Sequence, residues 1–141
     1  MNEDFQKFHI SVKGLIKFDN SFLLLQEHDG IWEAPGGRVN EGELLKEALL
    51  RELKEELDFN LSLDDIGNLF EFNQRYDYKL GNGWCLMTLF FEISLKQKLE
   101  INISDEHVNF VWVKKDTDLS KFVFKNPIQR AIFENFKNNL K

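Results

Sequence analysis

Alternating apolar residues open the chain. In FHISVKGLIKF (8–18), apolar side chains or glycine occupy every second position from Phe8 to Phe18. This period of two predicts a strand with one buried face. Turn residues follow at 19–21, and FLLLQE (22–27) predicts a strand that returns beside the first.

The second half of the chain predicts more strands and a closing helix. Apolar and aromatic residues concentrate in three segments, at 69–78, 84–95 and 109–114. KLGNG (79–83) between the first two is a hairpin-turn signal, and residues 61–69 are expected to form a connection. Asn126 followed by Pro127 predicts a helix start, and apolar residues then recur every four positions, at Ile128, Ile132 and Phe136. We therefore expect one mixed α/β domain over residues 1–141.

Residues from about Gly42 to Leu57 predict a further helix, which follows a loop at Pro35, Gly36 and Gly37. At 100° per residue, three of its carboxylates share an arc of about 100°. They belong to Glu52, Glu55 and Glu56. On the same side lie Leu45, Ala48 and Leu49, whereas a second apolar stripe is formed by Leu50, Leu53 and Leu57. This helix is expected to bury two faces, and its carboxylates adjoin one of them.

Three carboxylates at this spacing repel one another, and their ionised forms lose solvation when a site closes around them. A hard divalent cation with oxygen ligands would offset both costs, which favours Mg²⁺ or Mn²⁺. From the helix alone, a solvated face with ion pairs is the preferred interpretation. The adjacent glycines at 36 and 37 shift the balance, because backbone without Cβ atoms can approach a ligand closely.

Composition narrows the function further. The net charge of −6 over 141 residues disfavours a nucleic-acid partner and a membrane-surface role. One cysteine, Cys85, excludes an internal disulfide and a thiolate zinc cluster, and it is expected to be a small buried hydrophobe. We find no signal-like start and no membrane-spanning run, so a cytoplasmic, reducing location is expected.

The residues from Gly37 to Phe59 resemble the Nudix box of the MutT-like Nudix hydrolases. The family pattern is Gly-x5-Glu-x7-Arg-Glu-U-x-Glu-Glu-x-Gly-U, where U is bulky and apolar. Six of its seven fixed positions match, including Glu43 and Arg51. The departure is Asp58, where the family usually has the glycine that ends the helix. Aspartate adopts a left-handed backbone better than most residues but less readily than glycine, which puts the helix terminus in question.

The resemblance extends beyond the box, to the W-x-x-PGG lead-in and to a Glu-x5-Trp pattern from Glu106 to Trp112. It implies an α/β/α sandwich with a central mixed β-sheet, a catalytic loop and helix, and a C-terminal helix. The activity it implies is Mg²⁺-dependent hydrolysis of a nucleoside diphosphate linked to another group, by metal-activated water, with Mn²⁺ as an alternative cation. The substrate could be a nucleoside triphosphate, a nucleotide sugar or a dinucleoside polyphosphate.

The same resemblance assigns residues to roles. It implies that the metal is bound by Glu52, Glu55, Glu56 and the Gly36 carbonyl. Arg51 would orient these carboxylates, with Glu43 as support. The catalytic base is either Glu52 or Glu106, and Glu106 could also reach the metal. His107 is a third candidate for the base, although it is expected to be a surface residue.

Substrate contacts are less specific. Candidate base-stacking aromatics are Trp32, Tyr76, Tyr78 and Trp84, and candidate phosphate contacts are Arg38 and Arg75. Diadenosine polyphosphate hydrolases tend to have a tyrosine about seventeen residues after the box, and Tyr76 lies there. One tyrosine leaves the substrate class open. Many relatives dimerise, so a homodimer is compatible with the sequence. The alternative function is a catalytically silent Nudix-fold module that binds a nucleotide or a protein, although such modules typically lose carboxylates that this chain keeps.

Overall fold

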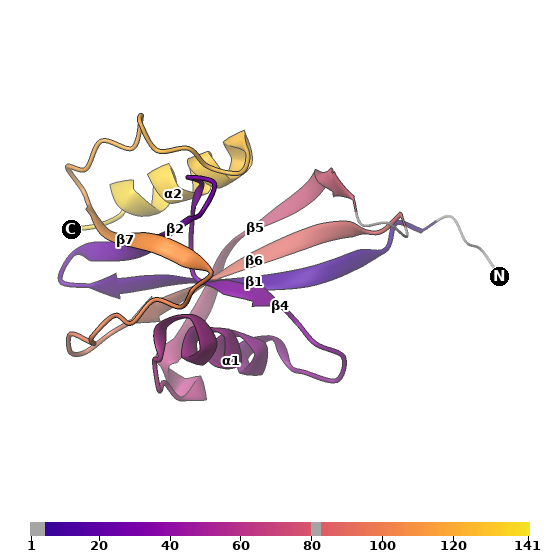
Figure 1. Ribbon diagram of the computed structural model, residues 1–141, viewed down its shortest axis with the longest axis horizontal. Helices are drawn as coiled ribbons and strands as arrows, with labels where there is room; N and C mark the ends of the chain where they lie inside the picture. Colours follow the sequence, from indigo (N-terminus) through magenta and orange to yellow (C-terminus); the bar gives the residue numbers. More distant parts are fainter. Residues whose placement is uncertain (1–4, 80–82) are drawn as a thin grey trace.

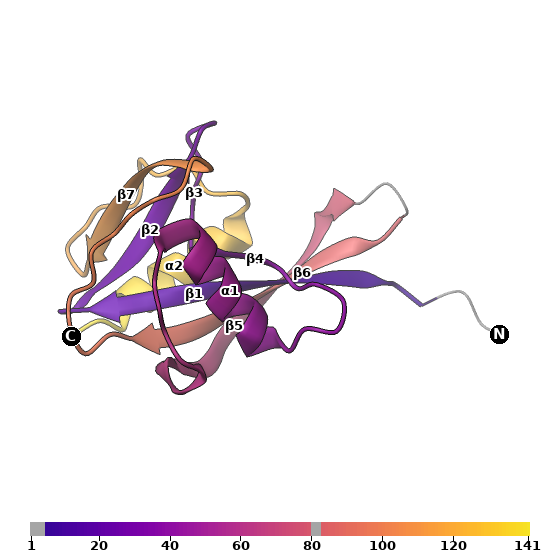
Figure 2. The ribbon, with the colours of Figure 1, turned by 60° about the horizontal axis from the view of Figure 1, so that its bottom comes forward.

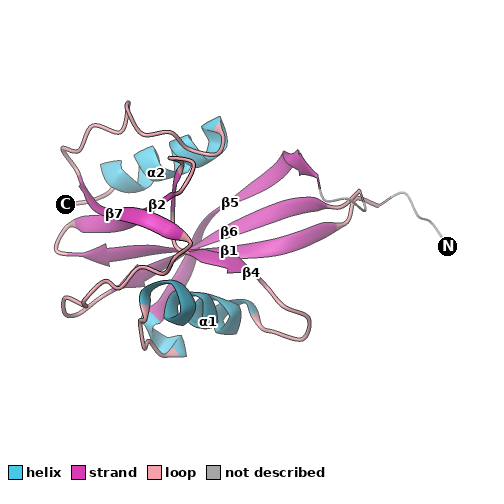
Figure 3. Ribbon diagram, viewed as in Figure 1, coloured by secondary structure: helices cyan, strands magenta, loops and turns pink. Residues whose placement is uncertain are grey.

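A mixed β-sheet lies between two helices, with α1 on one side and α2 on the other (Figures 1 and 3). The computed structural model describes residues 5–79 and 83–141, without the side chains of 76–79. In chain order the elements are β1 (Phe8–Phe18), β2 (Ser21–Glu27), β3 (Trp32–Glu33), β4 (Gly36–Arg38), α1 (Leu45–Leu57), the 3₁₀ helix η1 (Leu63–Asp65), β5 (Ile66–Lys79), β6 (Cys85–Ser94), β7 (His107–Lys114) and α2 (Pro127–Asn138).

This arrangement confirms the expected α/β/α sandwich, the main strands and the closing helix. Asn126 caps α2, because its side chain accepts a hydrogen bond from the Gln129 amide. Cys85 is buried, as expected. Residues 80–82 of the anticipated hairpin turn lie outside the described residues. Within the described residues, no helix has the length and apolar character needed to cross a membrane.

Several boundaries differ from the prediction; among them, β7 begins at His107 rather than at residue 109. Helix α1 begins at Leu45 rather than near Gly42, because Gly42 has a positive φ of 80° and ends a turn instead. The loop expected at 35–37 is partly strand, since β4 begins at Gly36 and pairs with β1. The connection expected at 61–69 contains η1, and β5 then starts at Ile66.

Strand β1 organises the sheet. It pairs in parallel with β6 along most of its length, from Phe8 to Lys17. On its other edge it pairs with two different strands: β2 at Lys17 and Phe18, and β4 at 11–13. Strand β1 pairs with β2 only beside their turn, and beyond it β2 diverges from β1, as Figure 2 shows. The functional site described below lies on this divergent side of the sheet.

The apolar residues form two clusters, one on each side of the sheet. Alternate residues of β1 supply both, with Val12 and Ile16 under α1 and Leu15 under α2. The two apolar stripes expected on α1 form one broad buried face instead, since Leu50 packs against the same cluster as Leu53. Leu45 is 37% exposed because it lies in the first turn of the helix.

Helix α1 ends at Leu57 although aspartate replaces the usual glycine. Asp58 adopts the left-handed conformation, with φ 58° and ψ 32°. The Phe59 amide donates to the Leu53 carbonyl at 3.3 Å, and the Asp58 amide donates to the Lys54 carbonyl at 3.0 Å. The Asp58 carboxylate also pairs with the Lys54 ammonium. Position 58 therefore terminates the helix as glycine would, with some backbone strain retained.

We expect the Asp58→Gly variant to be more stable than Asp58→Ala by about 1 kcal/mol, because glycine adopts this left-handed conformation without a Cβ clash. Both variants lose the exposed ion pair with Lys54, so the comparison isolates the backbone term. Urea denaturation of both proteins measures it. Equal free energies of unfolding would show that residue 58 carries no strain.

Candidate active site

Two adjacent glycines let β4 fit between β1 and α1. Gly36 has a φ of 137°, and a Cβ atom there would lie 2.0 Å from the Val12 carbonyl oxygen. At Gly37 a Cβ atom would lie 2.6 Å from the carboxylate of Glu52. The glycines therefore have packing reasons in addition to any approach to a ligand: one accommodates β1, and the other leaves space for a carboxylate of α1.

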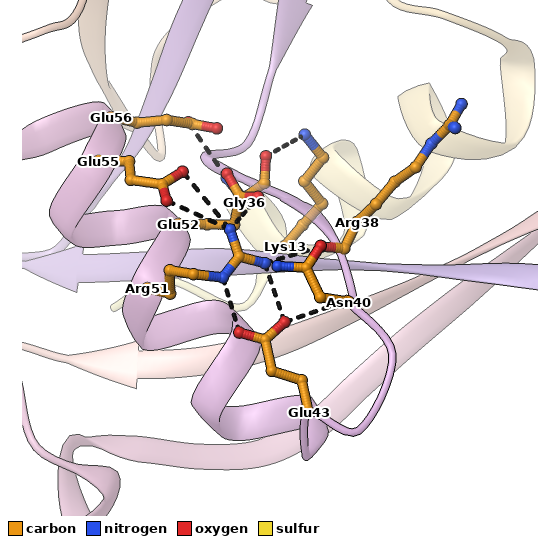
Figure 4. A network of polar contacts seen from close by, with 9 residues as sticks. All are labelled: Lys13, Gly36, Arg38, Asn40, Glu43, Arg51, Glu52, Glu55 and Glu56. Carbon is orange, nitrogen blue, oxygen red and sulfur yellow. Dashed lines mark hydrogen bonds and ion pairs between the residues drawn. The ribbon is translucent and has the colours of Figure 1, made fainter.

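The backbone of Gly36 is bound by two side chains from different elements (Figure 4). Its amide donates to Oε2 of Glu56 at 3.3 Å, and its carbonyl accepts from Nζ of Lys13 at 3.0 Å. Glu56 is only 3% exposed. A buried carboxylate and a partly buried ammonium thus bind the amide and the carbonyl of the same residue.

Arg51 connects the carboxylates of α1 with the loop that precedes the helix (Figure 4). It binds Glu43 in a bidentate manner, through Nε at 2.6 Å and NH2 at 2.9 Å. Its NH1 donates to Glu52 at 3.0 Å and to Glu55 at 3.4 Å, and its NH2 also donates to the Arg38 carbonyl at 3.0 Å. The hydrogen bond from Arg51 lowers the pKa of Glu43 to about 2, so this pair stays charged at neutral pH.

A cleft of about 330 Å³ opens beside this network. Five carboxylates line it, those of Glu27, Glu33, Glu52, Glu56 and Glu106. Four cations line it as well, Lys13, Arg38, Arg75 and Lys125, and the other polar residues include Ser11, Thr88 and Gln129. A cleft that holds both charges suits a ligand that brings both a cation and anionic oxygens.

Most of the residues predicted for the site line this cleft. They are Gly36, Arg38, Glu52, Glu56, Arg75 and Glu106. Glu55 is not among the lining residues, and its carboxylate, 58% exposed, pairs with Arg51.

Two of the four predicted aromatic contacts, Trp32 and Trp84, are not among the residues that line the cleft. Trp32 does not line it, since its ring packs 5.1 Å from that of Phe122 beside the apolar cluster under α2. Trp84 lies near His9, with ring centroids 4.8 Å apart. The side chains of Tyr76 and Tyr78 lie outside the described residues.

The sequence did not indicate a buried ion-pair network around Glu33. His107 Nε2 lies 3.0 Å from Oε1 of Glu33, and the ammonium groups of Lys13 and Lys125 each lie 3.5 Å from Oε2. Lys125 also pairs with Glu27 at 2.9 Å. The expectation that His107 is a surface residue is wrong: it is 6% exposed, because β7 begins at this residue and pairs it with Glu27 of β2.

One signal in the sequence could have indicated Lys13. Leu15 lies on the same face of β1 as Lys13 and is fully buried, so the supposedly polar face of this strand is covered as well. A lysine on a strand with two buried faces needs a partner, and such buried cations are commonly functional.

Opposing effects set the protonation of this network. Burial disfavours the charged form of Glu33, but Lys13 and the hydrogen bond from His107 hold its pKa well below the usual range. Burial works against protonation of His107, whereas the hydrogen bond with Glu33 raises its pKa above the usual value. For Glu56, burial dominates and raises the pKa to about 7, despite the charge of Lys13.

The donor set of the cleft fits a hard divalent cation. Glu52, Glu56, Glu106 and the Gly36 carbonyl offer only oxygen, which Mg²⁺ prefers and zinc does not require. A buried carboxylate with a raised pKa also gains stability from a nearby cation. Among the described residues, no group of three or more His, Cys, Asp or Glu side chains is arranged to hold a metal ion.

The raised pKa of Glu56 predicts how metal-free stability depends on pH. The folded protein binds the proton more tightly than the unfolded chain, whose carboxyl has the ordinary pKa of 4.5. The stabilising contribution is therefore complete below that value and is lost as pH rises through about 7. With a chelator present to remove metal, the free energy of unfolding of the wild-type protein should fall relative to that of Glu56→Gln as pH rises from about 5 to about 8. Parallel pH profiles for the two proteins would contradict the assignment.

Comparisons with known proteins agree with this geometry. The family model described as NUDIX domain matches residues 7–133. Nucleoside triphosphatase NudI of Salmonella typhimurium is 31% identical over 113 residues, which span 72% of this chain and 79% of that protein. An RNA pyrophosphohydrolase of Campylobacter jejuni is 31% identical over 117 residues, which span 74% of this chain and 72% of the relative.

A solved structure extends the comparison to the fold. The MutT protein from Methanosarcina mazei superposes with a TM-score of 0.75 at 27% identity, covering 93% of this chain and 94% of that one. The family model covers most of the chain, and the box and the residues that line the cleft lie within the matched region, which ends inside α2. The chain therefore belongs to the Nudix hydrolase family and is MutT-like.

Proposed function

We propose that this protein is a Mg²⁺-dependent pyrophosphohydrolase that cleaves a diphosphate linkage in a nucleoside diphosphate-X substrate. The observation that carries the proposal is the cleft in which two carboxylates of α1, Glu52 and the buried Glu56, line the same space as lysine and arginine side chains. The two curated relatives are named for different nucleotide substrates, a nucleoside triphosphate and RNA. Both names describe hydrolysis of a phosphate chain, which supports this class of reaction. They do not specify the leaving group.

Each group of side chains has a role in this proposal. Glu52, Glu56 and the Gly36 carbonyl hold the metal, and Glu55 and Glu106 complete the set, Glu55 after it leaves Arg51. When bound there, Mg²⁺ or Mn²⁺ would neutralise phosphate oxygens and lower the pKa of a water molecule. Arg51 keeps Glu52 in place through its hydrogen bond of 3.0 Å.

Lysine and arginine side chains of the cleft bind the phosphates in this proposal. Arg75 is buried and Arg38 is exposed, and both line the cleft together with Lys125. Guanidinium groups bind phosphate oxygens through pairs of hydrogen bonds, so they can align a diphosphate for attack. A nucleotide sugar, a nucleoside triphosphate and a dinucleoside polyphosphate all present the required group.

Two residues remain candidates for the base that takes the proton from water. Glu52 and Glu106 both line the cleft, from α1 and from the loop before β7. The Glu106 amide donates to Ser104 Oγ at 3.4 Å, which ties the backbone of this loop locally. We place the enzyme in the cytoplasm, with nucleotides as its small-molecule partners and a homodimer compatible with the fold.

Hydrolysis of a nucleotide panel in Mg²⁺ tests the proposal. We expect wild-type turnover of at least one member, and a loss of more than about 100-fold in Glu56→Gln, because loss of a direct metal ligand should exceed the usual effect of outer-shell changes. Glu47→Gln is the matched control, since Glu47 lies exposed on the same helix. Release of phosphate or pyrophosphate is the measurement.

Tight nucleotide binding without turnover of any panel member would overturn the proposal and favour the catalytically silent module. Phosphorus magnetic resonance in ¹⁸O-labelled water then identifies the attacked phosphorus in a productive reaction. The label enters the product that carries the attacked atom, so this measurement defines the reaction independently of rate.

A further inference from the structure

The peptide groups of Gly36 lie outside the hydrogen-bond ladder that joins β4 to β1. In antiparallel strands, hydrogen-bonded and non-hydrogen-bonded pairs alternate. The flanking bonds run from the Gly14 amide to the Pro35 carbonyl and from the Val39 amide to the Ile10 carbonyl. Gly36 is opposite Lys13 in this register, and its own amide and carbonyl bind side chains instead.

The Gly36 carbonyl accepts a hydrogen bond from the side chain of Lys13. Its Nζ donates to this oxygen at 3.0 Å and lies 3.5 Å from Oε2 of Glu33. The side chain is 13% exposed, although it lines the cleft. Figure 4 shows the ammonium reaching the carbonyl from the side opposite the α1 carboxylates.

An ammonium and a divalent cation cannot both use this oxygen at close range without strong repulsion, because their charges would be a few ångströms apart in a partly buried site. The Glu33 carboxylate is a second partner for the Lys13 ammonium. Lys13 can therefore stay paired with Glu33 after it releases the Gly36 carbonyl. Lys125 and His107 also contact Glu33, and the carboxylate is therefore shared among three cationic or protonatable groups.

We propose that Lys13 is a positioning residue that holds the Gly36 carbonyl in the metal-free protein, and that a divalent cation binds there by exchange with this ammonium. The inference rests on the metal site of the proposed function. It adds that the apo site is not simply a cluster of repelling carboxylates. One of its oxygens is kept in place by an internal cation, at the cost of weaker metal affinity.

Isothermal titration of the metal-free protein with Mn²⁺, without nucleotide, tests the exchange. Lys13→Met should bind Mn²⁺ about tenfold more tightly than wild type, the order expected when a unit charge close to the metal is removed. A merely structural role for Lys13 would give the opposite direction, because a disturbed site binds metal less well. Lys13→Gln, which is also neutral and keeps a donor, should follow Lys13→Met and serves if the methionine variant does not fold.

Lys17→Met is the matched control for net charge. Lys17 lies on the same strand but pairs with Glu92 at 3.5 Å and does not line the cleft. Its loss should change the Mn²⁺ affinity by no more than about twofold, because salt screens a distant exposed charge. Lys13→Arg, which retains the charge, should stay close to wild type.

The outcomes separate this inference from the proposed function. Unchanged or weaker Mn²⁺ binding in both neutral variants would overturn the exchange, while wild-type binding that is lost in Glu56→Gln would leave the metal site standing. Binding seen only after Lys13 is neutralised would support the exchange in its strongest form. Absence of Mn²⁺ binding in every variant would overturn the exchange and the metal site together, whereas absence of turnover with intact exchange would overturn the hydrolase proposal alone.

Discussion

The hydrogen bonds of one guanidinium hold the candidate site together. Arg51 contacts Glu43 before the helix, Glu52 and Glu55 on it, and the Arg38 carbonyl at the end of β4. Without this cation, neighbouring carboxylates of α1 would repel one another and the loop from 39 to 44 would lose its attachment to the helix. The planar geometry of arginine matters, because a lysine could not make the bidentate contact with Glu43 and the other bonds together.

Much of the fold was predictable because its signals are local. The alternation in β1 and the Asn-Pro start of α2 each depend on a few neighbouring residues, and both elements were found where expected. Helix α1 began later than predicted, because the amphipathic pattern does not detect that Gly42 adopts a positive φ. The short strand β4 could not be foreseen either, since three residues carry no period and its formation depends on the edge of β1.

The site divides in a similar way. The fixed spacing of Glu52, Glu55 and Glu56 brought them to one helix, and the box predicted which residues to inspect. Spacing did not reveal that Glu55 pairs with Arg51 and does not line the cleft, or that Lys13 and His107 both contact Glu33. These three come from separate strands, so their proximity is a product of sheet register and is absent from any local pattern. His107 in particular was misjudged because a histidine after an acidic loop looks exposed until β7 is extended to include it.

The divergence of β2 from β1 has a consequence for how such a protein can change over time. Where two strands are joined by a full ladder, a substitution at the seam disturbs backbone bonding as well as side-chain contacts. Here the pairing of β1 with β2 is confined to the turn, and residues of both strands, such as Ser11 and Glu27, line the cleft. Substitutions at such positions can therefore change the lining of the cleft without breaking a backbone hydrogen bond between β1 and β2.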